Sequence, residues 1–155
     1  MAAASRYVAV VGAGGGDVAA EVLALAEAVG AELARRGAVV VTGGLGGVME
    51  AVCRGARAAG GTTLGILPGS DRAAANPFVA VAVATGMGEL RNGLVVRCAD
   101  AVIAVGGEYG TLSEIALALK AGKPVAGLGT WAIRGVRAAE DPRAAVALVL
   151  GDPTA

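Results

Sequence analysis

The sequence predicts an α/β fold: a single doubly wound parallel sheet with helices on both faces, spanning residues 1–155 as one domain. Two observations predict it. Short, valine-rich apolar runs alternate with longer amphipathic stretches along the whole chain, and this alternation is typical of βαβ units that build a parallel sheet. The length of 155 residues, with no linker between the runs, is that of one domain.

The first strand is expected at residues 7–11, an uninterrupted apolar run. A parallel strand is covered by helices on both faces, so that both of its sides are apolar. Five later runs share the short length and the apolar character of the first. They lie at residues 39–42, 63–67, 78–83, 101–105 and 125–128.

The first helix is expected after Asp17, the expected N-cap, and should end at Gly37. Apolar residues recur between them at intervals of three or four, the spacing of one helix face: Val18, Val22, Leu25, Val29 and Leu33. Further helices are expected at residues 48–59, 89–98 and 112–119. A final helix should open at Asp141, which precedes Pro142 and caps the helix.

Composition excludes several classes of function. Thirteen basic and thirteen acidic residues cancel, which disfavours binding to nucleic acid or to an anionic membrane. The chain has no histidine, and this removes every histidine base and every histidine ligand to zinc. Two cysteines without a CxxC spacing predict no metal site and no disulfide framework. A reduced, cytoplasmic location is expected, and no apolar run is long enough to span a membrane.

Glycine-rich loops follow three of the expected strands, at residues 12–16, 43–47 and 106–110, and each leads into an expected helix. Helix N-termini present unpaired N–H groups, and glycine lets an anion approach them closely. The loops together predict a phosphate or nucleotide site, although tight strand-to-helix turns would explain any one of them. The candidate ligand contacts in the first two loops are Gly12, Gly14, Gly43, Gly44 and Gly46. The GxGxxG fingerprint and the P-loop motif are absent.

Two segments and one arginine resemble the Lonely Guy (LOG) family, whose members were once mislabelled lysine decarboxylases. Residues 105–114, VGGEYGTLSE, resemble the family motif PGGxGTxxE, and residues 42–49 resemble its GGxxGLM segment. Arg91 matches the arginine of the family's RK pair. The resemblance covers Tyr7 to about Leu128 and looks closest to short bacterial proteins similar to molybdenum-cofactor carrier protein. It implies a Rossmann-like fold and a homodimer or higher oligomer.

The resemblance implies two chemistries. LOG enzymes cleave a nucleoside 5′-monophosphate into base and ribose 5-phosphate, and this reading makes Arg91 and Glu114 the catalytic candidates. The implied phosphate contacts are Gly106, Gly107, Gly110 and Thr111. The carrier branch binds the phosphorylated pterin of molybdenum cofactor and need catalyse nothing. Asn92 stands where the enzymes have lysine, and Val105 replaces the proline of the motif.

Several of these residues have a purely structural alternative. Thr111-x-x-Glu114 is the spacing of a capping box, so Glu114 either caps a helix or faces a ligand. Arg91 is either a solvated helix charge or a ligand contact. Tyr109 either stacks on a base or belongs to an ordinary loop, and Trp131 is expected to serve packing.

The sequence therefore predicts binding of a nucleoside monophosphate or a pterin phosphate at the glycine loops, with no cofactor or metal required. A LOG-type phosphoribohydrolase is the alternative. A DNA-processing-type protein is disfavoured by the zero net charge, and a pyridoxal-phosphate decarboxylase is excluded because both lysines lie at a helix end. Because only 17% of the residues are charged, we expect a homodimer that buries the helices near 90–98 and 112–119.

Overall fold

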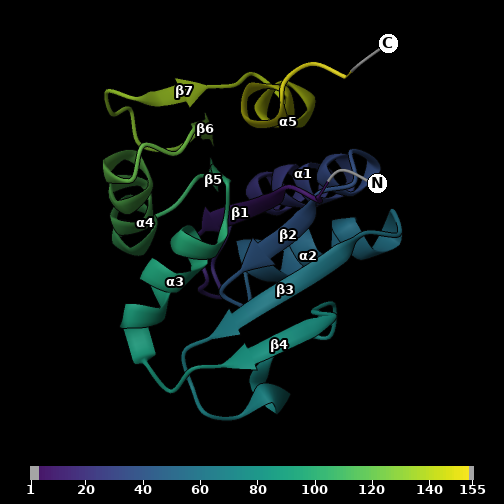
Figure 1. Ribbon diagram of the computed structural model, residues 1–155, viewed down its shortest axis with the longest axis vertical. Helices are drawn as coiled ribbons and strands as arrows, with labels where there is room; N and C mark the ends of the chain where they lie inside the picture. Colours follow the sequence, from purple (N-terminus) through teal and green to yellow (C-terminus); the bar gives the residue numbers. More distant parts are fainter. Residues whose placement is uncertain (1–3, 154–155) are drawn as a thin grey trace.

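The computed structural model describes residues 4–153; residues 1–3 and 154–155 of the predicted domain lie outside the described residues. The chain forms one seven-stranded sheet in the order β4-β3-β2-β1-β5-β6-β7, with every pair parallel. Figure 1 shows β4 and β7 at opposite edges of this sheet. The strands are β1 (Tyr7–Gly12), β2 (Val39–Thr42), β3 (Thr62–Leu67), β4 (Val81–Ala84), β5 (Ala101–Val105), β6 (Val125–Leu128) and β7 (Val136–Ala138).

Helices cover both faces of the sheet, as predicted. One face carries α1, α2 and α5, and the other carries α3 and α4, each group with its own cluster of buried side chains. The helices are α1 (Ala20–Arg35), α2 (Val48–Ala58), α3 (Arg91–Cys98), α4 (Tyr109–Lys120) and α5 (Pro142–Leu150), with 3₁₀ turns η1 (Arg72–Ala74) and η2 (Gly88–Leu90). The α/β doubly wound fold predicted from the sequence is confirmed.

Strand β1 explains why the apolar runs are continuous. Val8 and Val10 pack on the face of α1 and α2, whereas Ala9 and Val11 pack on the face of α3 and α4, and all four are buried. Side chains of a strand alternate between its two faces, so a strand covered on both faces has no position open to water. The same reasoning applies to β5, in which every residue is buried.

The strand order reverses direction between β1 and β5. From β1 the chain adds strands outward on one side as far as β4, and it then returns to place β5 on the other side of β1. Such a switch point opens a crevice at the carboxyl ends of the strands, where ligands of this architecture bind. The loops that follow β1, β2 and β5 are the three glycine loops, and parallel pairing puts them at this one edge.

Helix α1 and helix α2 touch backbone to backbone. A Cβ atom on Gly55 of α2 would overlap the carbonyl oxygen of Glu27, and one on Gly30 of α1 would overlap the carbonyl oxygen of Val52. Glycine at both positions lets the helices approach more closely than any other residue allows.

Two predicted caps are wrong. Helix α1 begins at Ala20 and Ala19 precedes it without a side-chain cap, because the glycine loop continues past Asp17. Helix α4 begins at Tyr109, before Thr111, because Gly106 and Gly107 complete the turn with positive φ angles of 56° and 107°. Thr111 is therefore the third residue of the helix, so it cannot be the N-cap of a capping box.

The edge strands differ from the sequence prediction. Strand β4 begins at Val81 rather than residue 78, because Asn76 and Thr63 bind the backbone of residues 78–80 into a turn. Strand β7 was not predicted. It has three residues, of which only Val136 is partly buried, so it lacks the apolar run of a central strand. Among the described residues, no helix is long and apolar enough to cross a membrane.

Candidate functional site

A pocket of about 240 Å³ opens at the carboxyl edge of the sheet, beside the switch point between β1 and β5. Its wall is made by the end of β1, residues of all three glycine loops, the first turns of α2 and α3 and the first two turns of α4. The lining residues are Val10, Val11, Gly12, Ala13, Gly14, Gly43, Met49, Arg91, Asn92, Glu108, Gly110, Thr111 and Glu114. Both charged residues singled out from the sequence, Arg91 and Glu114, are among them.

Four of the glycines predicted to bind ligand are absent from this lining and shape the loops behind it. The Gly44 amide donates to the Thr42 hydroxyl at 3.0 Å. The Gly106 carbonyl accepts from the Thr130 hydroxyl at 2.6 Å. Gly107 leaves room for the side chain of Thr111, and Gly46 lies near the carbonyl oxygen of Gly14. Ligand contact by these four glycines stays a prediction.

Arg91 is the first residue of α3 and is only 8% exposed. Its Nη2 donates to the Gly43 carbonyl at 3.3 Å, and its Nη1 donates to the Asn92 side-chain oxygen. Gly43 is needed here, because a Cβ at this position would lie 2.7 Å from Nη2. Burial lowers the pKa of Arg91, and the nearby charge of Glu114 opposes that change. Arginine nevertheless stays protonated at neutral pH.

One donor of Arg91 is unsatisfied. Its Nε is buried and has no hydrogen-bond partner among the residues that the structure describes. A buried donor without a partner costs free energy, and such groups in native proteins mark strain, a functional role or a bound molecule. Arg91 is thus a cation in the pocket wall, and its Nε is a donor that is not used within residues 4–153.

Glu114 lies in the second turn of α4 and is also 8% exposed. Burial raises the pKa of its carboxyl to about 7, although the charge of Arg91 acts in the opposite direction. The two side chains form no direct ion pair in the described part of the chain. Glu114 is therefore a carboxyl that lines the pocket and whose pKa is raised toward neutral pH.

The N-terminus of α4 supplies the other polar groups. The first amides of a helix have no partner within the helix, and Gly110 and Thr111, in the first turn of α4, line the pocket. The residue before the helix, Glu108, provides no side-chain cap. At α2, in contrast, the first amide, that of Val48, donates to the Ala13 carbonyl at 3.0 Å. The N-terminus of α4 is thus the better placed to receive an anion.

Sequence reasoning missed several lining residues. Glu108 brings a second acidic residue to the pocket, and its place in the third glycine loop is the signal that could have found it. Asn92 was noted only as a missing lysine, whereas its side chain binds the guanidinium of Arg91. Met49, at the start of α2 and just after the second glycine loop, also lines the pocket. The pocket is also lined by Ala13, Val10 and Val11. These residues are apolar, so the sequence gives no indication that they would face a ligand.

Neither cysteine lines this pocket. Burial raises the pKa of the Cys53 thiol, which lies 3.7 Å from the Thr42 hydroxyl. Cys98 is exposed at the end of α3. Over residues 4–153, no three acidic or cysteine side chains gather as metal ligands would.

Comparison with known proteins decides the family. The sequence profile of the SLOG cluster4 family matches residues 5–150. The chain belongs to the SLOG cluster4 family. The LOG-type, carrier-like relationship predicted from the glycine motifs is thereby confirmed.

Relatives of this SLOG cluster4 protein cover nearly the whole chain. An uncharacterised protein of Archaeoglobus fulgidus is 46% identical over 134 residues, 86% of this chain and 88% of that one. The molybdenum cofactor binding protein of Rippkaea orientalis has a similar structure, with a TM-score of 0.88, 35% identity and coverage of 96% and 97% of the two chains. The molybdenum cofactor carrier protein of Chlamydomonas reinhardtii has a TM-score of 0.84 at 35% identity, covering 94% and 96%.

The fold is also shared with proteins of a different class. DNA processing protein A of Streptococcus pneumoniae has a TM-score of 0.74 and covers 92% of this SLOG cluster4 chain, but its sequence is 18% identical. This chain spans 61% of that protein. The likeness extends to the fold alone.

Proposed function

We propose that this protein binds a phosphorylated, nucleotide-like ligand, a nucleoside monophosphate or a pterin phosphate, in the pocket beside β1 and β5. One observation carries the proposal. Buried Arg91, whose Nε has no hydrogen-bond partner within residues 4–153, shares the pocket with the first-turn residues Gly110 and Thr111 of α4. A cation and a helix N-terminus are the two elements that bind phosphate in proteins.

The remaining groups suit the rest of such a ligand. In this proposal the amides of Gly110 and Thr111 and the guanidinium of Arg91 bind the phosphate. Glu114, when ionised, accepts hydrogen bonds from sugar or side-chain hydroxyls. The 35% identity to proteins that bind and carry molybdenum cofactor supports the binding of a small ligand. The zero net charge continues to disfavour nucleic acid.

Hydrolysis is the second candidate function, and the position of the Glu114 carboxyl in the pocket is what favours it. In that reaction water adds to C1′ of the ribose while the base departs with the electrons of the C–N bond and acquires a proton. A carboxylate beside the sugar would stabilise the positive charge that develops there. Chromatography of the protein incubated with nucleoside monophosphates tests this: released base and ribose 5-phosphate would make the protein an enzyme, whereas intact nucleotide agrees with a binder.

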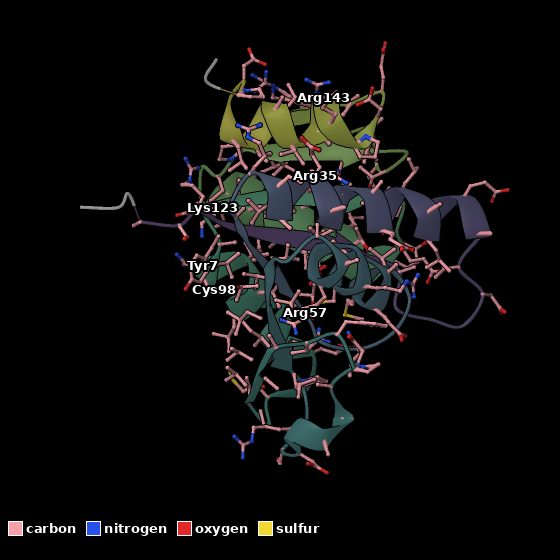
Figure 2. The ribbon with its side chains drawn as sticks, turned by 90° about the vertical axis from the view of Figure 1, so that its right-hand side faces the viewer. Tyr7, Arg35, Arg57, Cys98, Lys123 and Arg143 are labelled. Atoms are coloured by element: carbon pink, nitrogen blue, oxygen red, sulfur yellow. The ribbon has the colours of Figure 1, made fainter. Side chains whose placement is uncertain are left out.

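The phosphate contact predicts a difference between nucleotide and nucleoside. A nucleoside monophosphate should raise the melting temperature more than the same nucleoside, because binding to the folded state stabilises it by about 2.7 kcal/mol at one hundred times Kd. Arg91→Met should remove most of this difference in differential scanning fluorimetry. Arg143→Met is the matched control, because Arg143 is exposed on α5 (Figure 2), a helix that contributes no residue to the pocket. Equal shifts for nucleotide and nucleoside would contradict the proposal.

We also propose that the protein is a homodimer. A groove of about 400 Å³ between α3 and α4 exposes apolar side chains, including Leu90, which is 75% exposed, and the exposed Leu94 and Leu117. Exposed apolar patches mark contact surfaces. These are the two helices on which the sequence analysis placed the contact, and a second copy of the chain is the proposed occupant.

Disrupting this groove should give monomers. Leu94→Arg places a charge in the centre of the proposed contact, where it would be buried without a partner. We expect light scattering at micromolar concentration to show a dimer for the wild type and a monomer for the variant. Ala28→Arg, an exposed position on α1, is the control and should leave the mass unchanged. A monomeric wild type would overturn the dimer.

A further inference from the structure

An exposed tyrosine stands beside the pocket. Tyr109 is the first residue of α4 and is 80% exposed. Its neighbours on both sides in the sequence, Glu108 and Gly110, line the pocket. The backbone of Tyr109 therefore lies at the rim of the proposed phosphate site, in the helical turn whose amides are proposed to bind the phosphate.

The ring of Trp131 packs against the ring of this tyrosine. The two ring centroids are 6.0 Å apart and the ring planes are inclined by 33°, a tilted arrangement within the range of favourable aromatic pairs. The indole Nε1 of Trp131 donates to the carbonyl oxygen of Glu108 at 3.2 Å. The adjacent Thr130 hydroxyl donates to the Gly106 carbonyl at 2.6 Å.

These two hydrogen bonds join the loop after β6 to the loop after β5 on either side of Gly107. The tryptophan is half-buried and the tyrosine is exposed, so the pair presents one aromatic ring to solvent while the other supports it. A large, exposed, preorganised aromatic ring gains free energy when a planar ligand covers it, because little side-chain freedom is lost on binding.

We propose that Tyr109, supported by Trp131, is the stacking platform for the planar heteroaromatic ring of the ligand. The proposal rests on the proposed function, which places the phosphate of the same ligand in the pocket. Purines and pterins share the required feature, a flat π face. The platform thus separates two tasks: the pocket binds the phosphate, and Tyr109 binds the ring.

The experiment compares a ligand with a ring and one without. Guanosine 5′-monophosphate and ribose 5-phosphate carry the same phosphate and sugar, and only the first can stack. In calorimetry we expect Tyr109→Ala to weaken binding of the nucleotide about tenfold and to leave that of ribose 5-phosphate unchanged. Tyr109→Phe should restore nucleotide binding, because stacking needs the ring and not the hydroxyl. Tyr7→Ala, at the amino end of the sheet (Figure 2), is the matched control.

Fluorescence gives an independent measurement. Trp131 is the only tryptophan in the chain, so we expect guanosine 5′-monophosphate, and not ribose 5-phosphate, to change the emission of the wild type. Unchanged nucleotide affinity in Tyr109→Ala, or an equal loss for both ligands, would overturn the platform while leaving the phosphate site intact. If neither ligand binds the wild type, the proposed function fails and the platform fails with it. Repeating the titrations with neopterin phosphate shows which ring is preferred.

Discussion

Replacing Glu114 with glutamine is expected to make the protein more stable at pH 8 and a weaker binder of nucleoside monophosphate. Burial raises the pKa of this carboxyl from 4.5 to about 7. Between those two pH values the folded protein keeps a proton that the unfolded chain has lost, so stability falls as the pH rises through this window and stays low above it. The cost is on the order of 3 kcal/mol. Glutamine, which has no charge to bury, should remove it.

Denaturant unfolding at pH 5 and pH 8 checks this expectation. The wild type should lose stability between the two pH values, and Glu114→Gln should lose much less. Glu140→Gln is the control, because Glu140 is exposed in the segment before α5 and the variant should follow the wild type. A variant that is destabilised at pH 8 would show that the carboxylate of Glu114 stabilises the fold.

The same variant should bind nucleotide more weakly. A hydrogen bond from a hydroxyl to a carboxylate is charge-assisted and contributes about 1.5–3 kcal/mol, which corresponds to a loss of roughly tenfold or more in affinity. Greater stability together with weaker binding is typical of a residue retained for its function. Wild-type affinity in calorimetry on the folded variant would remove Glu114 from the proposed binding site.

Adding one methyl group at Gly55 should destabilise the fold strongly. The Cβ of Gly55→Ala would overlap the carbonyl oxygen of Glu27, and a backbone atom cannot move aside as a flexible side chain can. Helix α2 must then shift away from α1 and disturb the buried cluster between them, at a cost of about 3 kcal/mol. Unfolding measured by circular dichroism at one protein concentration checks this value.

Gly93→Ala makes the same chemical change at a permissive place. Gly93 lies inside α3, where a Cβ would meet no atom of residues 4–153 within 4 Å. Because Gly93 lines the groove proposed for the dimer, both glycine variants are compared in the monomeric Leu94→Arg background. Alanine is the better helix former by about 0.5–1 kcal/mol, so this variant should be neutral or more stable. Similar losses at both positions would mean that the close contact of α1 and α2 does not explain the effect.

The sequence was most informative where one physical requirement dominates. Strands buried on both faces need unbroken apolar runs, and the runs at 7–11 and 101–105 therefore predicted β1 and β5. Strand β7 has a single partly buried residue, so its sequence contains no apolar run from which a strand could be predicted. The wrong caps at Asp17 and Thr111 have another origin. Spacing alone does not tell where a glycine loop ends, which depends on the φ angles of residues such as Gly107.

The candidate site was predicted in outline, because parallel strands bring their carboxyl ends to one edge. Arg91 and Glu114 were selected by resemblance to a family motif, and both line the pocket. The role of Asn92 as a partner of Arg91 could not be predicted, since it depends on side-chain geometry. Nor does any sequence pattern show that Trp131, after β6, supports Tyr109, which begins α4.

Lys123 bears on how freely this site could be redesigned. Lys123 does not line the pocket. Its ammonium group donates to the carbonyl oxygens of Val96, Arg97 and Ala99 at 2.7, 3.0 and 2.6 Å. Lys123, in the loop after α4, thereby binds the carboxyl end of α3 at the amino edge of the sheet (Figure 2). The helices that carry Arg91 and Glu114 are thus held together at the end remote from the pocket, rather than by a bond between the two charges. Arg91 or Glu114 could therefore be replaced to change the specificity of the pocket, because the hydrogen bonds of Lys123 that hold the two helices together would remain.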